Sequence, residues 1–445
     1  MRILELRVDS TSTFEEVDKF NRKPLVTGLT RLVKEFSGET VICLDGKWGE
    51  GKTVFLQLWR NDLNNNGFPT LYLNAFEKDF RGDAFTTVCA AILESHGRLG
   101  GDPSVRERFL HKAVQVAKGF GFLALRVGLR AATAGVIELR DGDVAADEAV
   151  RATSEFLDRS LVSAIESGAE QERAVAEFKE VLEQIALEFC RERGGELLPA
   201  VFIVDELDRC RPNFAVEMLE VLKHFFSAKN VVFVLGANLE ILSKSVESVY
   251  GISGEGNHYL RRFMNIVVRF SGRSGARRRA ELENFLNGLW DRGGIPEHHR
   301  EIRNYMIELL VDIAVLKEVS LRDLERIMGQ LCVSLHFISR GNIMPPPLLS
   351  TLVVLRVLEP GLFEKACNGS LSFVELDSWF NFDRIEEGSH GINWARRWLH
   401  ALMTSPDQRT EDQKNILKSV HIHGDRPERF VQFFAQSIVD AAWVS

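Results

Sequence analysis

Cysteine is scarce in this chain, and its spacing argues against two kinds of site. The 445 residues contain six cysteines, and none of them forms a C-x-x-C pair. Such spacing is not that of a disulfide framework or a structural zinc site. Four cysteines lie within apolar runs, which predicts small buried residues in a reducing, cytoplasmic environment: Cys43, Cys89, Cys190 and Cys332.

Uninterrupted apolar runs are also missing where a targeting or membrane segment would need them. Residues 1–7 alternate charged and apolar side chains, unlike the apolar stretch of a signal peptide. Residues 119–139 are long enough for a membrane span, but Arg126 and Arg130 lie near its middle. Each central arginine costs about 3 kcal/mol of insertion, so we expect no integral membrane insertion. A buried or interfacial helix fits better, which leaves peripheral membrane association open.

An excess of positive charge is absent as well. The net charge is −8 and the pI is about 5.9, which argues against a dedicated nucleic-acid binder. A local basic cluster could still face nucleic acid or an acidic partner, although such a run is more often a solvated loop. Its members are Arg269, Arg273, Arg277, Arg278 and Arg279. Internal repeats and low-complexity tracts are not evident.

The chain is too long for one small domain, and its patterns divide it into five parts. In residues 1–99, expected strands at 40–45 and 69–76 alternate with helical patterns, which predicts a parallel sheet covered by helices. Residues 100–197 break this alternation and predict a helical insertion. The sheet resumes in residues 198–275, and a helical lid follows over 276–343. Residues 344–445 begin with a proline-rich boundary and predict a helical C-terminal module with aromatic residues in its core.

The segment from Gly46 to Thr53 has the pattern G-x-x-x-x-G-K-S/T between an expected strand and an expected helix. Glycines let several backbone N–H groups point at one anion, and the helix N-terminus adds partial positive charge. Lys52 would reach the β- and γ-phosphates of a nucleotide, and the Thr53 hydroxyl would ligate Mg²⁺. A glycine-rich turn with a surface lysine is the alternative. The remaining expected nucleotide-binding residues here are Gly46, Trp48, Gly49, Glu50, Gly51 and Val54.

A second motif follows the insertion, where residues 200–204 form an apolar run that ends in Asp205 and Glu206. This is the Walker B pattern of a buried strand with two acids at its carboxyl end. Asp205 would hold hydrated Mg²⁺, and Glu206 would act as general base for the attacking water. Such a run is a weak signal alone, but the upstream phosphate-binding motif strengthens it.

Residues 230–237 predict another core strand, and the polar residue that follows it is Asn238. A side chain at this place could touch the γ-phosphate or the water, as a sensor does. It could equally cap the next helix, and the two roles can coexist.

Three motifs together resemble the KAP family of P-loop NTPases. They are Gly46-Lys47-Trp48-Gly49-Glu50-Gly51-Lys52-Thr53, Asp205-Glu206-Leu207-Asp208-Arg209-Cys210-Arg211-Pro212 and Tyr259-Leu260-Arg261-Arg262-Phe263. The resemblance covers residues 15–340. It implies an additional-strand P-loop ATPase core with an insertion after the second strand. Many members have an aspartate where this chain has Asn238, and many carry membrane spans in the insertion. Bacterial relatives include phage-exclusion proteins and parts of anti-phage systems.

Three arginines are candidates for contacts with phosphate. Arg209 could reach a phosphate of a neighbouring subunit or pair with Asp208. Arg262 matches the family's basic position and is our candidate for a catalytic arginine finger, although it could be one of a solvated basic pair. Arg322 follows Ser320, an expected helix N-cap, and resembles the arginine that reaches the nucleotide from the family's helical lid.

These observations predict an α/β P-loop NTPase that hydrolyses ATP with Mg²⁺. The guanine motif N-K-x-D is not evident, in agreement with ATP, the nucleotide that the resemblance implies. We expect a homo-oligomer that acts as a nucleotide-driven switch or motor with other proteins of a defence complex. The alternative is a nucleotide-binding scaffold with little turnover, which recruits effector proteins through residues 345–445.

Overall fold

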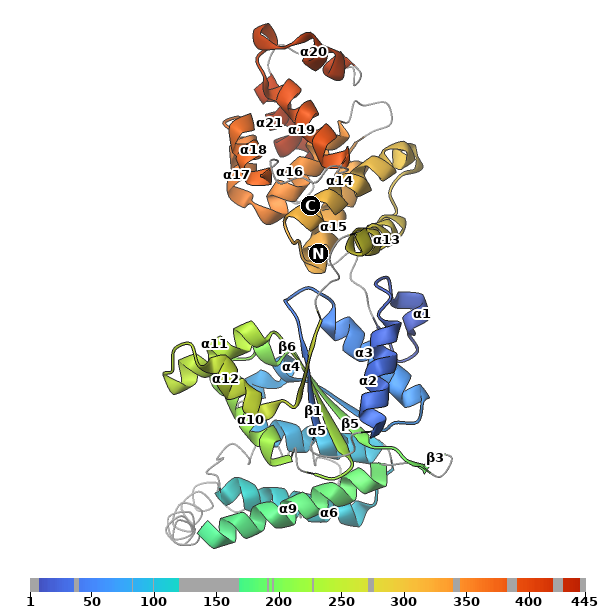
Figure 1. The fold of residues 1–445 in the computed structure, drawn as a ribbon, viewed down its shortest axis with the longest axis vertical. Coiled ribbons are helices and arrows are strands. Elements are labelled where there is room, and N and C mark those ends of the chain that lie inside the picture. Colours follow the sequence, from blue (N-terminus) through green and yellow to red (C-terminus); the bar gives the residue numbers. More distant parts are fainter. Residues whose placement is uncertain are drawn as a thin grey trace, which may run out of the picture.

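The structure is a computed structural model in which a parallel sheet with covering helices joins a helical region (Figure 1). It describes residues 8–35, 40–81, 83–98, 100–119, 168–189, 192–193, 196–225, 228–270, 276–338, 345–381, 390–418 and 427–440.

The sheet has five parallel strands in the order β2-β5-β6-β1-β7. Their bounds are β1 Thr40–Asp45, β2 Thr70–Asn74, β5 Ala200–Asp205, β6 Val231–Ala237 and β7 Ile266–Arg269. β6 lies between β1 and β5, the strands that precede the two sequence motifs. This confirms the predicted additional-strand P-loop fold. Asn74 pairs in register with Asp205, and Asp205 with Gly236, so the carboxyl ends of the strands meet at one edge.

The central strands are buried on both faces because apolar, β-branched residues run without alternation. Residues such as Ile42, Ile203 and Val234 pack with α1 (Phe14–Val17), α2 (Lys23–Glu35) and α3 (Lys52–Asn65). Their neighbours Cys43, Val204 and Leu235 pack on the opposite face. The helices that cover that face include α5 (Ala84–Arg98), α10 (Pro212–Phe225) and α11 (Leu239–Tyr250).

The predicted insertion contributes a helix pair below the sheet, α6 (Pro103–Gly119) and α9 (Gly168–Phe189). Phe109 and Phe178 join the pair, with ring centroids 5.0 Å apart. The buried His96 on α5 contacts the Glu188 carboxylate at 2.6 Å. Beyond Gly119, the candidate interfacial segment 119–139 lies outside the described residues. A short antiparallel hairpin, β3 (Glu192–Arg193) and β4 (Glu196–Leu197), follows α9 and was not predicted. Among the described helices, none has the length and apolar character that a membrane crossing needs.

The connections at the carboxyl edge of the sheet are short. α4 (Ala75–Lys78) and the 3₁₀ helix η1 (Asp79–Arg81) follow β2, and η2 (Leu207–Arg209) follows β5. At the opposite, amino edge of the sheet, α12 (Gly256–Leu260) and η3 (Arg261–Phe263) lead into β7.

One hydrophobic core joins the helices of the predicted lid and those of the predicted C-terminal module. Leu331 on α15, Leu352 on α16 and Trp398 on α19 all belong to it. The proposed division at residues 343 and 344 therefore does not separate two cores. The elements are α13 Ala276–Arg292, η4 Glu297–Ile302, α14 Arg303–Leu316, α15 Leu321–His336, α16 Pro346–Leu358, α17 Pro360–Cys367, α18 Phe373–Phe380, α19 His390–Met403, η6 Pro406–Gln408, α20 Glu411–Lys418, α21 Pro427–Phe433 and the π-helix η7 Phe434–Asp440.

A buried acid also joins these helices. The Asp312 carboxylate on α14 pairs with Arg279 on α13 and accepts a hydrogen bond from the backbone N–H of Ile392 on α19, at 2.9 Å.

Among the cysteines, Cys43, Cys89 and Cys332 are buried as predicted, Cys210 is buried as well, and Cys190 lies outside the described residues.

Candidate functional site

The phosphate-binding loop runs from the end of β1 to the first turn of α3. Gly49 and Gly51 have φ angles of 80° and 85°, a left-handed conformation that favours glycine. A Cβ atom on Gly46 would lie 2.7 Å from the Glu50 carboxylate, which accepts the backbone N–H of Lys47 at 2.9 Å. The loop is thus closed by Glu50 and opens onto the N-terminus of α3, where backbone donors and the helix dipole favour an anion.

Lys52 begins α3, and its side chain is buried beneath this loop. The ammonium group donates hydrogen bonds to the carbonyl oxygens of Gly46 and, at 3.1 Å, of Lys47. Burial lowers the pKa of Lys52, whereas the nearby Asp208 and Asp205 raise it. A cation held in this way is suited to bind phosphate oxygens.

Asp205 lies at the carboxyl end of β5 and is almost completely buried. Its carboxylate accepts hydrogen bonds from the Tyr72 hydroxyl and the Glu206 backbone N–H, both at 2.8 Å, and the nearby Thr53 hydroxyl lowers its pKa. Gly236 on β6 makes room for this carboxylate, because a Cβ atom there would lie 2.6 Å from its oxygen. Tyr72 and Gly236 were not predicted as site residues, since both contacts cross between strands.

The residues present fit a magnesium ion. Burial is the main reason why the pKa of Asp205 is raised to about 6, and a cation beside the carboxylate would offset that cost. The Thr53 hydroxyl is a second oxygen donor at the same place. Two protein ligands are enough for Mg²⁺, which keeps several waters and binds phosphate oxygens in nucleotide sites.

Glu206 has a left-handed backbone conformation, with φ 59° and ψ 29°. Its carboxylate forms an ion pair with Arg209 and accepts a hydrogen bond from the Asn74 side-chain amide at 3.1 Å. The predicted pairing of Arg209 with Asp208 is therefore wrong within this chain. The reason is local: the left-handed turn at Glu206 and the 3₁₀ turn after it bring Glu206 and Arg209 together. Asp208 instead accepts a hydrogen bond from the Trp48 indole N–H.

Asn238 caps a helix, one of the two roles predicted for it. Its side-chain oxygen accepts the backbone N–H groups of Glu240 and Ile241 at the start of α11. Asp45 at the end of β1 accepts the N–H of Leu239, at 2.9 Å. Asn238 is not among the residues that line the cavity described below, so the structure gives no contact that supports a sensor role.

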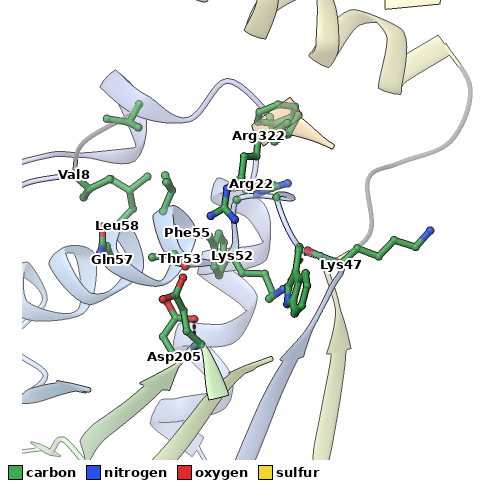
Figure 2. Close-up of a pocket in the computed structure, with 18 of the residues that line it drawn as sticks. Val8, Arg22, Lys47, Lys52, Thr53, Phe55, Gln57, Leu58, Asp205 and Arg322 are labelled. Atoms are coloured by element: carbon green, nitrogen blue, oxygen red, sulfur yellow. Dashed lines mark hydrogen bonds between the residues drawn. The ribbon is translucent and has the colours of Figure 1, made fainter. Parts of the chain in front are cut away.

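Arg322 reaches the site from the other side. Ser320 caps α15 by accepting the N–H of Asp323 at 3.1 Å, as predicted. The start of α15 packs directly on the phosphate-binding loop, because a Cβ atom on Gly49 would lie 2.7 Å from the Ser320 hydroxyl oxygen and 3.1 Å from Cβ of Arg322. Figure 2 shows the Arg322 side chain above the loop.

Arg22, just before α2, is a further basic residue that sequence reasoning missed. Its guanidinium group donates to the carbonyl oxygen of Glu50 at 3.0 Å and lies over the Phe270 ring, 3.8 Å from the centroid. Burial lowers the pKa of Arg22 to about 10. Helical patterns were predicted within residues 1–99, but no motif connects Arg22 with Glu50, 28 residues later.

These residues surround one cavity of about 620 Å³ (Figure 2). Lys52, Thr53 and Asp205 line one part of it, and Arg22 and Arg322 line another. Trp48, Gly49, Gly51, Val54 and Glu206 also line it, as do Asp208 and Arg209. The volume is in the range of small-molecule sites.

The sequence pattern of the KAP family P-loop domain matches residues 22–336 of this chain. The chain belongs to the KAP family. The match to the KAP domain ends with α15, so α16 and the later helices lie beyond it. No curated protein matches this KAP chain.

Two solved structures of other proteins are similar to this KAP chain. One is the structure of the Aeropyrum pernix ORC2 protein (ADPNP-ADP complexes), which is 12% identical to this chain with a TM-score of 0.40. The match covers 100% of this chain and 98% of the ORC2 chain. The other is the crystal structure of Cdc6p from Pyrobaculum aerophilum, which is 13% identical to this chain with a TM-score of 0.39. The match covers 95% of this chain and 94% of the Cdc6p chain.

Arg262 of this KAP protein lies outside the cavity. It is exposed on η3, and its guanidinium group lies 5.6 Å from the centroid of the Tyr259 ring. The structure therefore does not bring Arg262 together with Lys52 and Glu206 of the same chain, and a role as arginine finger requires a second copy. Of the predicted basic cluster, Arg273 lies outside the described residues, and Arg279 forms an ion pair with Asp312.

Proposed function

We propose that this protein is a Mg²⁺-dependent ATP hydrolase. The observation that carries the proposal is the convergence of Lys52, Thr53, Asp205 and Glu206 on one cavity, at the carboxyl edge of the sheet and the N-terminus of α3. A phosphate-binding cation, two oxygen donors that fit Mg²⁺ and a carboxylate for a water molecule are the parts that nucleotide hydrolysis needs.

Each part has a defined role in the proposed reaction. The loop amides and Lys52 bind the phosphates and stabilise the negative charge that develops on them. Thr53 and Asp205 would hold Mg²⁺, which supplies positive charge beside the phosphate oxygens. Glu206 accepts a proton from water as the water oxygen bonds to the γ-phosphorus. The bond from that phosphorus to the bridging oxygen breaks, and ADP leaves with the bonding electrons.

We assign ATP as the nucleotide because the family resemblance implies ATP and the guanine motif N-K-x-D is not evident in the sequence. The same resemblance supports a role as a switch within an anti-phage defence complex. The shared core of α15 and α16 supports a switch, since it connects the residues around Arg322 with the helices beyond the KAP domain. A scaffold with little turnover is the second candidate, favoured by the contacts of the Glu206 carboxylate with Arg209 and Asn74.

The test is ATP turnover by the purified protein over a series of protein concentrations. Lys52→Ala and Glu206→Gln are measured beside the native chain, together with binding of a non-hydrolysable ATP analogue. The proposal predicts turnover that disappears in both variants, with binding lost in Lys52→Ala and retained in Glu206→Gln. Specific turnover that rises with protein concentration would indicate an active assembly. A native protein that binds ATP without turnover at any concentration would favour the scaffold, and one that does not bind ATP would contradict both.

A further inference from the structure

Both carboxylate oxygens of Asp205, the proposed magnesium ligand, are held by neighbouring groups. Its Oδ1 atom accepts the backbone N–H of Glu206 at 2.8 Å, and a Cβ atom on Gly236 would lie 2.6 Å from this same oxygen. Its Oδ2 atom accepts the Tyr72 hydroxyl at 2.8 Å. The backbone after β5 thus fixes one oxygen, and the Tyr72 side chain fixes the other.

Tyr72 also connects the two elements that carry the proposed metal ligands. On β2 it pairs in register with Ile203, two residues before Asp205 on β5. The Arg60 guanidinium group on α3 lies over its ring, 5.6 Å from the centroid, a distance at which a cation attracts an aromatic face. Because Thr53 lies in the first turn of α3, Tyr72 contacts both the strand that supplies Asp205 and the helix that supplies Thr53.

Tyr72 can affect bound Mg²⁺ only through Asp205. Asp205 and Thr53 are among the described residues that line the cavity, and Tyr72 is not. A phenol carries its proton at neutral pH, so the hydroxyl donates to the carboxylate and, being uncharged, leaves the negative charge to attract a cation. A carboxylate has about four lone-pair positions, so two donors leave others for a metal.

Hydrogen bonds to a metal ligand commonly tune the metal site. They orient the ligand before the metal arrives, and their loss typically costs about 10–100-fold in metal affinity or activity. The Tyr72 hydroxyl stands in this relation to Asp205, since it touches the ligand and not the cavity.

We propose that Tyr72 is a positioning residue that orients Asp205 for Mg²⁺ and so makes nucleotide binding depend on the metal. The inference deepens the proposed ATPase function and rests on it. The hydroxyl group carries the effect, and the ring serves to place that hydroxyl. Removal of the hydroxyl therefore weakens nucleotide binding when Mg²⁺ is present and leaves binding without the metal unchanged.

The first experiment measures how much Mg²⁺ strengthens binding of a non-hydrolysable ATP analogue. Isothermal titration gives the Kd in excess EDTA and in excess Mg²⁺ for the native protein, Tyr72→Phe and Tyr305→Phe. Tyr305 is the matched control, because it is half-buried like Tyr72 and its hydroxyl donates to the Gly391 carbonyl in the helical region, at 3.4 Å. Tyr72→Phe should reduce the gain from Mg²⁺ by about tenfold with an unchanged Kd in EDTA, and Tyr305→Phe should change neither.

The possible failures of this experiment are distinguishable. A gain in Tyr72→Phe equal to that of the native protein overturns the inference and leaves the ATPase function standing. A Kd that rises equally in EDTA and in Mg²⁺ also overturns it, because this is the result expected of a residue that only supports the fold. A native protein that does not bind the analogue, or binds it equally well with and without Mg²⁺, contradicts the proposed Mg²⁺-dependent function, and the inference falls with it.

A second experiment tests the contact without nucleotide. The denaturant midpoints of the native protein, Tyr72→Phe, Asp205→Ala and the double variant form a double-mutant cycle in Mg²⁺-free buffer. Tyr72→Phe should lower the midpoint of the native chain and leave that of Asp205→Ala nearly unchanged, because the carboxylate that accepts the hydroxyl is then gone. Equal losses in the two backgrounds overturn the inference.

Discussion

The indole N–H of Trp48 donates a hydrogen bond to the carboxylate of Asp208, and this bond joins the phosphate-binding loop to the loop that follows β5. Trp48 is 47% exposed, whereas Asp208 is buried. A hydrogen bond to a charged and buried group contributes more than one at the surface, because its loss leaves the carboxylate with one donor fewer. The two nucleotide motifs are thus tied together directly, through a residue type that the family pattern places inside the loop.

Replacing Trp48 with phenylalanine tests this connection. Because the ring is kept and the donor is lost, we expect Trp48→Phe to lower the free energy of unfolding by about 1–2 kcal/mol and to weaken ATP binding. Denaturant unfolding and nucleotide titration measure the two effects. Trp394→Phe is the control, since Trp394 is 41% exposed and packs edge-on against Tyr305 far from the cavity. Equal effects of the two substitutions would contradict a specific role for the Trp48 bond.

Arg322 and Arg326 form a matched pair on α15. Arg322 lines the cavity, whereas Arg326 is 64% exposed and pairs with Asp323 on its own helix. A guanidinium group near a phosphate contributes a charge-assisted hydrogen bond, so we expect Arg322→Ala to raise the Kd for ATP by about tenfold. Arg326→Ala should leave it unchanged. Isothermal titration with ATP and with ADP measures the effect. Equal Kd values for ATP in the two variants would contradict a role for Arg322 in nucleotide binding.

Glu217 on α10 should make stability depend on pH. Burial and the nearby Asp83 raise the pKa of Glu217 from 4.5 to about 7. The folded protein therefore holds a proton that the unfolded chain releases near pH 4.5, so this contribution to stability is complete below that pH and is lost as the pH rises through 7. Water around the half-buried group screens the effect, which leaves about 1 kcal/mol.

The measurement is the melting temperature of Glu217→Gln and the native protein from pH 5 to pH 8. Glutamine cannot ionise, so the variant should be more stable than the native chain at pH 8 and close to it at pH 5. Glu301→Gln, at an exposed position on η4, is the control and should follow the native curve. Parallel curves for Glu217→Gln and the native protein would show that Glu217 ionises normally in the fold.

The sequence predicted those parts of the fold that depend on neighbouring residues. The apolar run before Asp205 became β5 with the predicted bounds, and a helical pattern after the expected strand at 69–76 became α5. Ser320 caps α15 because its partner lies three residues away. The parallel sheet followed from the alternation of such elements, and the position of β6 between β1 and β5 followed from the family resemblance.

The sequence could not predict contacts between residues far apart in the chain. Tyr72 and Asp205 are 133 residues apart and Asn74 and Glu206 are 132 apart, and only the register of β2 on β5 brings each pair together. The partner of Arg209 depends on one left-handed residue, Glu206, for which no local signal exists because glutamate rarely adopts that conformation. The prolines from Pro345 onward, which led to the predicted boundary, begin α16, and no local signal shows that α16 packs in one core with α15.

Under the proposed switch function, that single core would make the helical region a lever. α15 starts on the phosphate-binding loop at Gly49 and continues into a core that holds α14, α16 and α19, with the buried Asp312 as a further tie between α13, α14 and α19. A densely packed interior does not absorb a change in the tilt of one helix, so the helices around it turn together. The displacement grows with distance from the pivot at Gly49. α20, at the far end of the molecule in Figure 1, would therefore travel furthest for each small adjustment around the nucleotide.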